Sequence, residues 1–433
     1  MTGNMSSAAG SLRNRHKERE DAVSAVLLSL VSGKEIVMIG PEGTGKDDIA
    51  KDACGIFGEK TKGYTISPST DKDEISSEGG ALILDDVFKA NSGTMNRIAE
   101  MMNSGAIIFG SSADAPSEAD EAYSLYDRFT IRSFIGPLRS DEVFLNAVNG
   151  KKDDAAIEKI SVTDIEKIRK DAADITTDDD VLEAILSLRD GFRDAGKYVS
   201  DGRWKDSVLV MKAAAAAVGD KNVSISYIPL LQHTLCDSPE DKDEVRSAIF
   251  AVCTPGSLEL NGLYTEAEEL LRLAVESKGA VDESAGFPRI IHCYDCNSSF
   301  PSLKRLKEHS ISRPRHTYAD PHAAADSNSQ DYIKYSYESL VTLLSSKYGW
   351  DLFRKSDTAV RERFLNEAEE LMRRKRTLDD SYENDRKKLT DGTERNFWLT
   401  EQDRKDILAV FNLRSAELAE IESLIKDVEY ILK

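Results

Sequence analysis

The stretch that decides the fold is EIVMIGPEGTGKDDIA, residues 35–50. EIVMI is a short apolar run typical of a buried strand, and KDDIA opens a run that favours a helix. Between them lie glycines 40, 43 and 45, which let a loop curl until its backbone N–H groups point inward. This order of strand, glycine-rich loop and helix predicts a phosphate-binding loop in which Lys46 reaches the phosphates.

A second motif, ALILDD (81–86), joins four apolar residues to two acids. We expect Asp85, at the strand end, to hold Mg²⁺ through water and Asp86 to orient an attacking water. Glu is usual in the second place, so Asp86 is one methylene short. Asp47 departs further, because the loop motif has Ser or Thr there; its carboxylate can bind Mg²⁺ but repels phosphate when the metal is absent. The residues therefore predict nucleotide binding with weakened hydrolysis.

Composition limits the function further. The chain has 433 residues and a net charge of −20, which argues against a protein that coats nucleic acid or anionic membranes. No apolar stretch approaches a membrane span, and the polar start has no signal-peptide core. The five cysteines are too few and too scattered for a disulfide scaffold. We expect a soluble cytoplasmic protein in a reducing compartment.

The order of apolar runs predicts an α/β fold followed by helices. Strand-like runs alternate with helical segments, which indicates a parallel sheet covered on both faces; they occupy 35–40, 64–67, 81–86, 106–110 and 129–134. The strand pattern stops after Pro137. The expected domains are a disordered N-terminus over 1–14, an α/β nucleotide-binding domain over 15–137, a helical lid over 138–254 and a helical C-terminal domain over 255–433.

Five stretches carry a family resemblance over about residues 15–250: GPEGTGKD, ALILDDVFKA, IIFGSSADAP, LYDRFTIR and YVSDGRWKDSVLVMKAAA. They resemble the MoxR group of AAA+ ATPases, and within it the RavA-like regulatory ATPases. The C-terminal helices resemble that group's triple-helical domain more weakly. The resemblance implies an AAA+ P-loop domain with an all-α lid, ATP or ADP with Mg²⁺, and a hexameric, chaperone-like ring. It also implies a von Willebrand A-domain partner or another protein client.

The resemblance also assigns roles to single residues. Arg128, in YDRF, matches the arginine finger that contacts the γ-phosphate in the neighbouring subunit. The sensor-2 arginine falls in VSDGRW, where either Gly202 or Arg203 aligns. The expected nucleotide-contacting residues are Gly40, Pro41, Glu42, Gly43, Thr44, Gly45, Lys46, Asp47, Asp48 and Arg203, with Asp47 and Asp85 as the magnesium ligands.

Two further departures from the family point toward weak hydrolysis. The sensor-1 position, normally Asn, aligns with Ala113, and Ser111 or Ser112 would replace it only weakly. The short segment between the strand runs at 64–67 and 81–86 also lacks the family's pore-facing hairpin. Together with Asp47 and Asp86, these departures predict a protein that does not thread substrates.

Residues 286–318 contain a pattern typical of a C2H2 zinc finger: Cys293-x2-Cys296-x3-Phe300-x5-Leu306-x2-His309. Two thiolates on a turn and imidazoles on a helix close a tetrahedron around zinc, and the metal supplies the folding energy of so small a module. His316 is the expected fourth ligand, although six residues separate it from His309. The alternatives are His322 or His292 as fourth ligand, or a loop with reduced cysteines and no zinc.

Three functions fit these observations. The first is a ring-forming AAA+ ATPase with slow hydrolysis that acts as a chaperone or assembly factor. The second is an inactive, nucleotide-bound ring scaffold that displays its zinc modules. The third is nucleic-acid binding through the finger, whose base-facing positions are Ser302, Lys304, Arg305 and Glu308. One finger buries little DNA surface, so a structural or protein-docking role is favoured.

Overall fold

The computed structural model describes residues 2–56, 61–76, 80–150, 159–254, 257–278, 286–321, 334–348 and 358–432. The chain forms two compact units. The first comprises Met1–Pro255 and Asp385–Val410, and the second comprises Gly256–Asn384 and Phe411–Lys433. Among the described residues, no helix combines the length and the apolar character needed to cross a bilayer.

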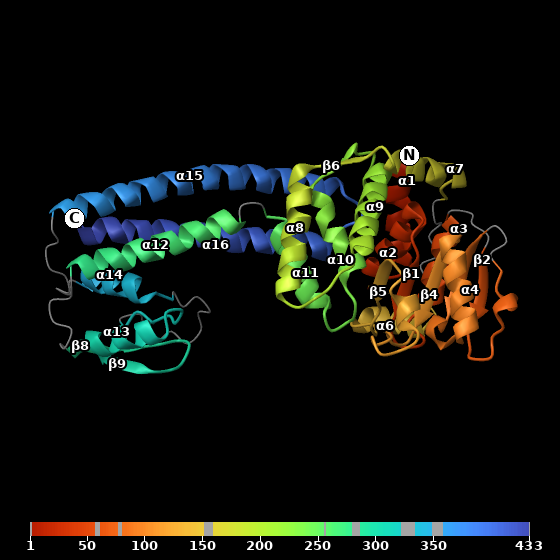
Figure 1. The fold of residues 1–433 in the computed structure, drawn as a ribbon, viewed down its shortest axis with the longest axis horizontal. Helices are drawn as coiled ribbons and strands as arrows, with labels where there is room; N and C mark the ends of the chain where they lie inside the picture. Colours follow the sequence, from red (N-terminus) through yellow and green to blue (C-terminus); the bar gives the residue numbers. More distant parts are fainter. Residues whose placement is uncertain are drawn as a thin grey trace. The chain divides into compact units, whose positions relative to one another are not determined.

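A five-stranded parallel sheet is the centre of the first unit (Figure 1). Its strands follow the order β2-β3-β4-β1-β5, so β1 lies between β4 and β5, and Ile36 pairs with Phe109 on one side and Ile131 on the other. The strands are β1 (Ile36–Ile39), β2 (Thr61–Thr65), β3 (Ala81–Asp85), β4 (Ile108–Ser112) and β5 (Ile131–Phe134). The predicted parallel α/β sheet is confirmed.

Helices cover the sheet and bury its apolar side chains. Ile39 of β1 and Leu84 of β3 pack with Met101 of α4 and with Phe129 in one buried cluster, while α2 and α3 contact the strands and each other. The elements are α2 (Glu20–Ser32), α3 (Lys46–Ile56), η1 (Lys72–Glu74), η2 (Val87–Lys89), α4 (Ser92–Asn103) and α5 (Tyr123–Tyr126). Between β2 and β3, η1 is the only helix among the described residues, and residues 77–79 of this segment lie outside them.

The N-terminus corrects an expectation. Residues 1–14 were expected to be disordered, but α1 (Thr2–Arg15) is a helix. Its side chains Met5 and Leu12 are almost fully buried, and Arg13 donates hydrogen bonds to Ser24 Oγ (2.7 Å) and to a backbone carbonyl (3.0 Å). The expectation was wrong because most of the segment is small or polar, and its few spaced apolar residues were overlooked. The helix packs against α2, α3 and α9.

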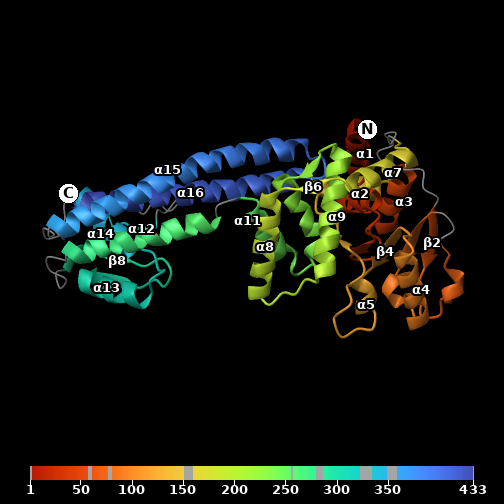
Figure 2. The same ribbon diagram turned by 45° about the horizontal axis from the view of Figure 1, so that its top comes forward.

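The lid consists of helices that follow the sheet in the chain (Figure 2). Its longest helix, α9, buries an alanine-rich face that includes Ala213 and Ala217. The lid elements are α6 (Asp141–Val148), α7 (Val162–Ala172), β6 (Thr176–Thr177), α8 (Asp179–Asp194), α9 (Asp201–Val218), β7 (Asn222–Val223), η3 (Ile225–Leu231), α10 (Gln232–Leu235) and α11 (Lys242–Val252).

A segment from late in the chain belongs to the same unit as the lid. Within Asp385–Val410, the Trp398 indole donates to Ala214 O (3.0 Å), and Asp403 pairs with Arg246 at 2.7 Å. The expected domain over 255–433 is therefore divided between the two units. Buried contacts more than 150 residues apart in the chain decide this boundary.

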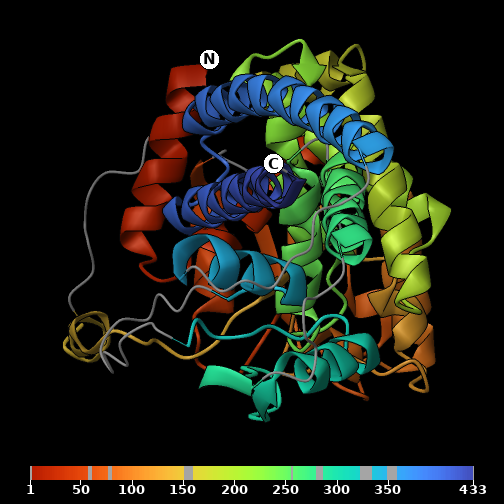
Figure 3. The same ribbon diagram turned by 90° about the vertical axis from the view of Figure 1, so that its left-hand side faces the viewer.

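The second unit combines long helices with a small ββα segment (Figure 3). Ion pairs such as Lys375–Glu422 (2.7 Å) link its helices. In Figures 1 and 3 α14 lies between α12 and the ββα segment. The elements are α12 (Ser257–Lys278), β8 (Gly286–His292), β9 (Ser299–Ser302), α13 (Leu303–Ser312), α14 (Tyr337–Tyr348), α15 (Thr358–Arg395) and α16 (Glu401–Leu432); α15 and α16 each have residues in both units.

Candidate nucleotide and metal sites

The glycine loop adopts a geometry that only glycine tolerates well. Gly43 and Gly45 have φ of +75° and +84°, in the left-handed region. At Gly40, a Cβ atom would lie 1.9 Å from the carbonyl oxygen of Ile135, so no side chain fits there. The loop leads directly into α3, whose first residue is Lys46. The curled backbone and the helix N-terminus form an arrangement suited to bind phosphate.

Lys46 is buried against its own loop. Its Nζ donates to Gly40 O at 2.6 Å and to Pro41 O at 2.9 Å. Burial lowers the pKa of Lys46, while the nearby charges of Asp85 and Asp47 oppose that shift. The ammonium group is therefore satisfied by loop carbonyls, and a phosphate group would be a stronger, charged partner for it.

Asp47, in the first turn of α3, has a carboxylate oxygen without a hydrogen-bond partner among the described residues. Its Oδ1 is buried and makes no hydrogen bond with any residue that the structure describes. Burial raises the pKa of Asp47, and the negative charge of Asp85 raises it further. Two carboxylates that repel each other disfavour double ionisation unless a cation neutralises them. The orphaned oxygen and the neighbouring acid form a donor set suited to Mg²⁺, which prefers oxygen ligands.

The acids that end β3 are held by different partners. Asp85 Oδ1 accepts a hydrogen bond from Ser111 Oγ of β4 at 2.5 Å. Asp86 has φ of +56°, and its carboxylate pairs with Lys89 at 2.8 Å. Of the two serines considered as sensor-1 substitutes, Ser111 thus contacts an acid of this motif, whereas Ser112 donates to a backbone carbonyl at Asp114.

A cleft of about 2170 Å³ adjoins the loop within the first unit. Its lining includes Gly40 and Pro41 of the loop, Ala113 after β4, and Lys197 and Arg203 of the lid. The cleft therefore brings together the glycine loop, the residue that aligns with sensor 1 and one of the two residues expected at sensor 2.

Arg203 is the centre of a charged cluster that sequence reasoning did not predict. It donates to Asp127 Oδ1 (2.6 Å), to Asp127 O (3.0 Å) and to Asp237 Oδ1 (3.0 Å). Arg132, buried in β5, also pairs with Asp237. The Lys197 Nζ atom lies 2.7 Å from Asp237 Oδ2. Burial alone would raise the pKa of Asp237, but Arg132 and Lys197 hold it below its ordinary value.

The predicted arginine finger is placed next to this cluster. Arg128 is exposed, and its side chain makes one long hydrogen bond, to Asn103 Oδ1 at 3.4 Å. Asp127, which holds Arg203, is the preceding residue. The turn that carries Arg128 is thus fastened to the lid, while the Arg128 side chain itself is only weakly held.

A comparison with protein families agrees with the helical lid. Residues 180–249 match the AAA lid domain family. The chain has an AAA+ fold. Two uncharacterized proteins of Methanocaldococcus jannaschii are similar to it: one is 24% identical over 292 residues (59% of this chain, 76% of that protein), and the other is 22% identical over 270 residues (54% and 70%). A crystal structure of a "putative ATPase" from Cytophaga hutchinsonii is 13% identical, with a TM-score of 0.47, covering 58% of this chain and 93% of that one.

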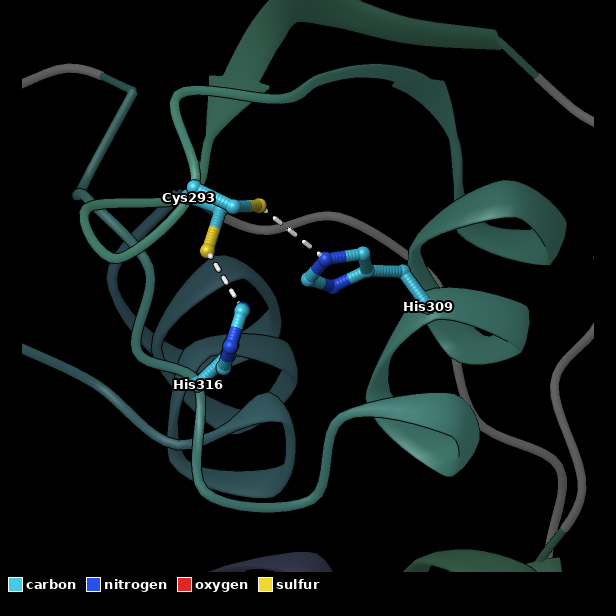
Figure 4. A group of neighbouring side chains, drawn as sticks. Cys293, His309 and His316 are labelled. Atoms are coloured by element: carbon cyan, nitrogen blue, oxygen red, sulfur yellow. Dashed lines mark hydrogen bonds between the residues drawn. The ribbon is translucent and has the colours of Figure 1, made fainter.

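The second unit holds a separate cluster of side chains that could bind a metal ion. Cys293, Cys296, His309 and His316 offer ligand atoms that all lie within 4.8 Å of one another. Figure 4 shows Cys293, His309 and His316 pointing toward a common centre. Cys293 Sγ lies 3.4 Å from His316 Nδ1, and Cys296 Sγ lies 3.3 Å from His309 Nε2. Two sulfur and two nitrogen donors match a structural zinc site.

The ββα segment brings the four residues of this cluster together. The hairpin β8–β9 carries both cysteines in its turn region, α13 carries His309, and the chain returns after α13 to place His316. His309 Nδ1 is also 2.9 Å from the Tyr318 hydroxyl, an outer contact that fixes the ring. His292 instead bonds Ser299 Oγ at 2.9 Å, and His322 lies outside the described residues.

The cysteine thiols differ in the direction in which their surroundings shift the pKa. Hydrogen bonding to Ser298 lowers the pKa of Cys296 to about 6, which favours the thiolate that zinc requires. The cysteines outside the cluster are buried, and burial raises the pKa of Cys236 to about 12. They behave as core residues rather than ligands.

Proposed function

We propose that this chain is a RavA-like AAA+ protein of the MoxR group that binds ATP or ADP with Mg²⁺ at Gly40–Lys46. The observation that carries the proposal is the curled glycine loop, with Lys46 buried at its end and Asp85 close by. Lys46 and the loop N–H groups would hold the phosphates, and Asp85 and Asp47 would hold Mg²⁺. The metal, when bound, supplies charge that stabilises the phosphate oxygens.

We infer that hydrolysis is slow. The carboxylate of Asp47 replaces a neutral hydroxyl, so it adds negative charge beside the phosphates. Asp86 is short and paired with Lys89, which leaves it poorly free to orient water. Ala113 supplies no polar group at sensor 1, and Ser111 is already bonded to Asp85. Each of these features removes part of the positioning on which phosphoryl transfer depends.

We further propose that the chain works as a homo-oligomeric, hexameric ring in the cytoplasm. The exposed, weakly held Arg128 supports this, because an arginine finger needs a neighbouring subunit to act upon. Arg203, rather than Gly202, is the proposed sensor-2 residue, since it lines the cleft. The ring would act as a chaperone-like assembly factor on a protein client, such as a von Willebrand A-domain partner, with a zinc-stabilised module on each subunit.

Binding and turnover measured on the same preparation test this function. We expect about one ATP bound per chain in Mg²⁺, with turnover well below the median enzyme rate of about 10 s⁻¹. Full binding with no turnover at all would instead favour the inactive ring scaffold. Absence of both would reject the nucleotide site.

A further inference from the structure

Two hydrogen bonds from the lid hold the turn that carries Arg128. Arg203, on α9, donates to Asp127 Oδ1 at 2.6 Å and to the backbone oxygen of the same residue at 3.0 Å. Asp127 directly precedes Arg128 in the chain. Both bonds therefore fix the backbone beside Arg128, whose own side chain makes only a long hydrogen bond, of 3.4 Å, to Asn103 among the described residues.

The neighbouring residues limit how much of this turn can move. Tyr126 and Phe129 are almost fully buried, so their side chains anchor both ends of the turn in the core. Asp127 and Arg128, which lie between them, are exposed. Loss of the bonds from Arg203 would therefore loosen two residues locally and leave the rest of the domain folded.

The two acids that hold Arg203 would respond differently to its departure. Asp237 also pairs with Arg132 and Lys197, so two cations would still neutralise it. Among the described residues, Asp127 would keep only a longer contact to Arg132, at 3.7 Å. Its side chain is 54% exposed, and exposed ion pairs add little stability. The contact with Asp127 is therefore the easier one to break.

A bound nucleotide would compete with Asp127 for Arg203. Both residues line the cleft beside the glycine loop. A phosphate group in that cleft offers the guanidinium two oxygens in a bidentate arrangement and more than one negative charge, so it is a stronger partner than a half-exposed carboxylate. Arg203 would then turn from Asp127 to the phosphates.

We propose that Asp127 is a positioning residue that makes the order of the Arg128 turn depend on the nucleotide in its own subunit. An empty subunit keeps the bonds from Arg203 and presents a held Arg128 to its neighbour. A subunit with ATP bound presents a loosened one, so hydrolysis at one site depends on the occupancy of the next. This role rests on the proposed function, because it requires ATP at the glycine loop and Arg128 as the finger.

Thermodynamic linkage sets the size of two effects. If ATP has to break the contact between Asp127 and Arg203, removing that contact beforehand strengthens ATP binding by the same factor by which the contact holds the turn closed. Asp127→Asn should therefore tighten ATP binding, and raise the exchange rate of the amide hydrogens in the turn, by one common factor of about ten. In the intact turn these amides are bonded, from Asp127 N to Tyr123 O (2.8 Å) and from Arg128 N to Leu125 O (3.1 Å).

Hydrogen exchange of the full chain, measured by mass spectrometry with and without Mg²⁺ and ATP, tests the proposal. In the wild type, ATP should raise the exchange rate over residues 123–129 about tenfold. In Asp127→Asn the exchange should already be fast, and ATP should not change it. Asp241→Asn is the matched control and should respond like the wild type, because Asp241 pairs with Lys197 in the same network but has no described bond to Arg203 or Arg128.

ATP titration of the same samples separates failure of this role from failure of the proposed function. A wild type that binds ATP with unchanged or slower exchange over 123–129 would overturn the role of Asp127 and leave the nucleotide site intact. Equal responses to ATP in the wild type and in Asp127→Asn would also overturn it. A wild type that binds no ATP would overturn both the role and the proposed function.

Discussion

We expect the side chain of Asp47 to affect how fast ATP at the glycine loop is hydrolysed. Replacing it by threonine supplies the usual hydroxyl and removes the charge that is buried beside Asp85. We expect Asp47→Thr to raise kcat by about 10-fold or more, equivalent to about 1.4 kcal/mol of barrier. Steady-state ATP hydrolysis measures this. A fall in turnover would show that hydrolysis requires Asp47 as a magnesium ligand and that its carboxylate is not what slows the reaction.

We expect Asp427, on α16, to make the stability of the second unit depend on pH. Burial raises the pKa of Asp427 from 3.8 to about 6, so the folded state holds this proton more tightly than the unfolded chain does. The contribution to stability is present below pH 4 and is lost as the pH rises toward 6. Asp427→Asn should therefore stabilise the unit at pH 7.5, by at most about 3 kcal/mol, and have no stabilising effect at pH 4. Thermal melts at the two pH values check this; equal effects at both would exclude it.

The sequence predicts the positions of some site residues but not the pairs that they form. The positions of Lys46 and Asp85 could be predicted, because each sits at a fixed offset from a strand. The pairing of Arg203 with Asp127 and of Arg132 with Asp237 could not, because the partners are 76 and 105 residues apart and no local pattern marks them. Arg203 was found only as one of two aligned candidates.

The helices and strands also differ in whether the sequence alone predicts them. Buried strands such as β1 and β3 were predictable because apolar runs with flanking turn residues leave few alternatives. Helix α1 was missed because its sequence is small and polar, and its stability comes from packing rather than from local propensity. The return of the chain that brings His316 to the cysteines depends on the turn after α13, which residue spacing does not specify.

The ββα segment gives the sharpest prediction at this scale. The purified chain should hold about one zinc, and Cys293→Ser should release it, whereas Cys253→Ser should not. Chelation should expose residues 286–318 to protease and leave the AAA+ domain intact, because metal binding drives the folding of small modules. Metal analysis with limited proteolysis makes the measurement. A zinc-free chain whose segment stays protected would show that the packing on α14 suffices alone.

His316→Ala separates the proposed fourth ligand from its alternatives. Loss of zinc in this variant is the expected result, because His316 Nδ1 lies beside Cys293 Sγ in the cluster. His292→Ala is the matched control and should retain the metal, since its ring bonds Ser299 instead. Retention of zinc by His316→Ala would point to another histidine or to water.

The whole assembly is tested by mixing subunits. Lys46→Ala removes a nucleotide site but leaves the arginine finger, and Arg128→Ala does the reverse. Each variant alone should be inactive, while an equal mixture should recover about a quarter of wild-type turnover, because intact sites then meet intact fingers from neighbours. No recovery in rings that are shown to mix would mean that Arg128 does not act across a subunit boundary.

Equilibrium titration of ATP into the wild-type chain and into Lys46→Ala, both with Mg²⁺, tests the nucleotide site most directly. The wild type should bind one ATP per chain. Lys46→Ala should bind none up to millimolar concentrations, because Lys46 is the cation of the loop itself. Lys51→Ala, an exposed lysine further along α3, should bind like the wild type. Undiminished affinity in Lys46→Ala, or no binding by the wild type, would contradict the assignment of the glycine loop as an ATP site.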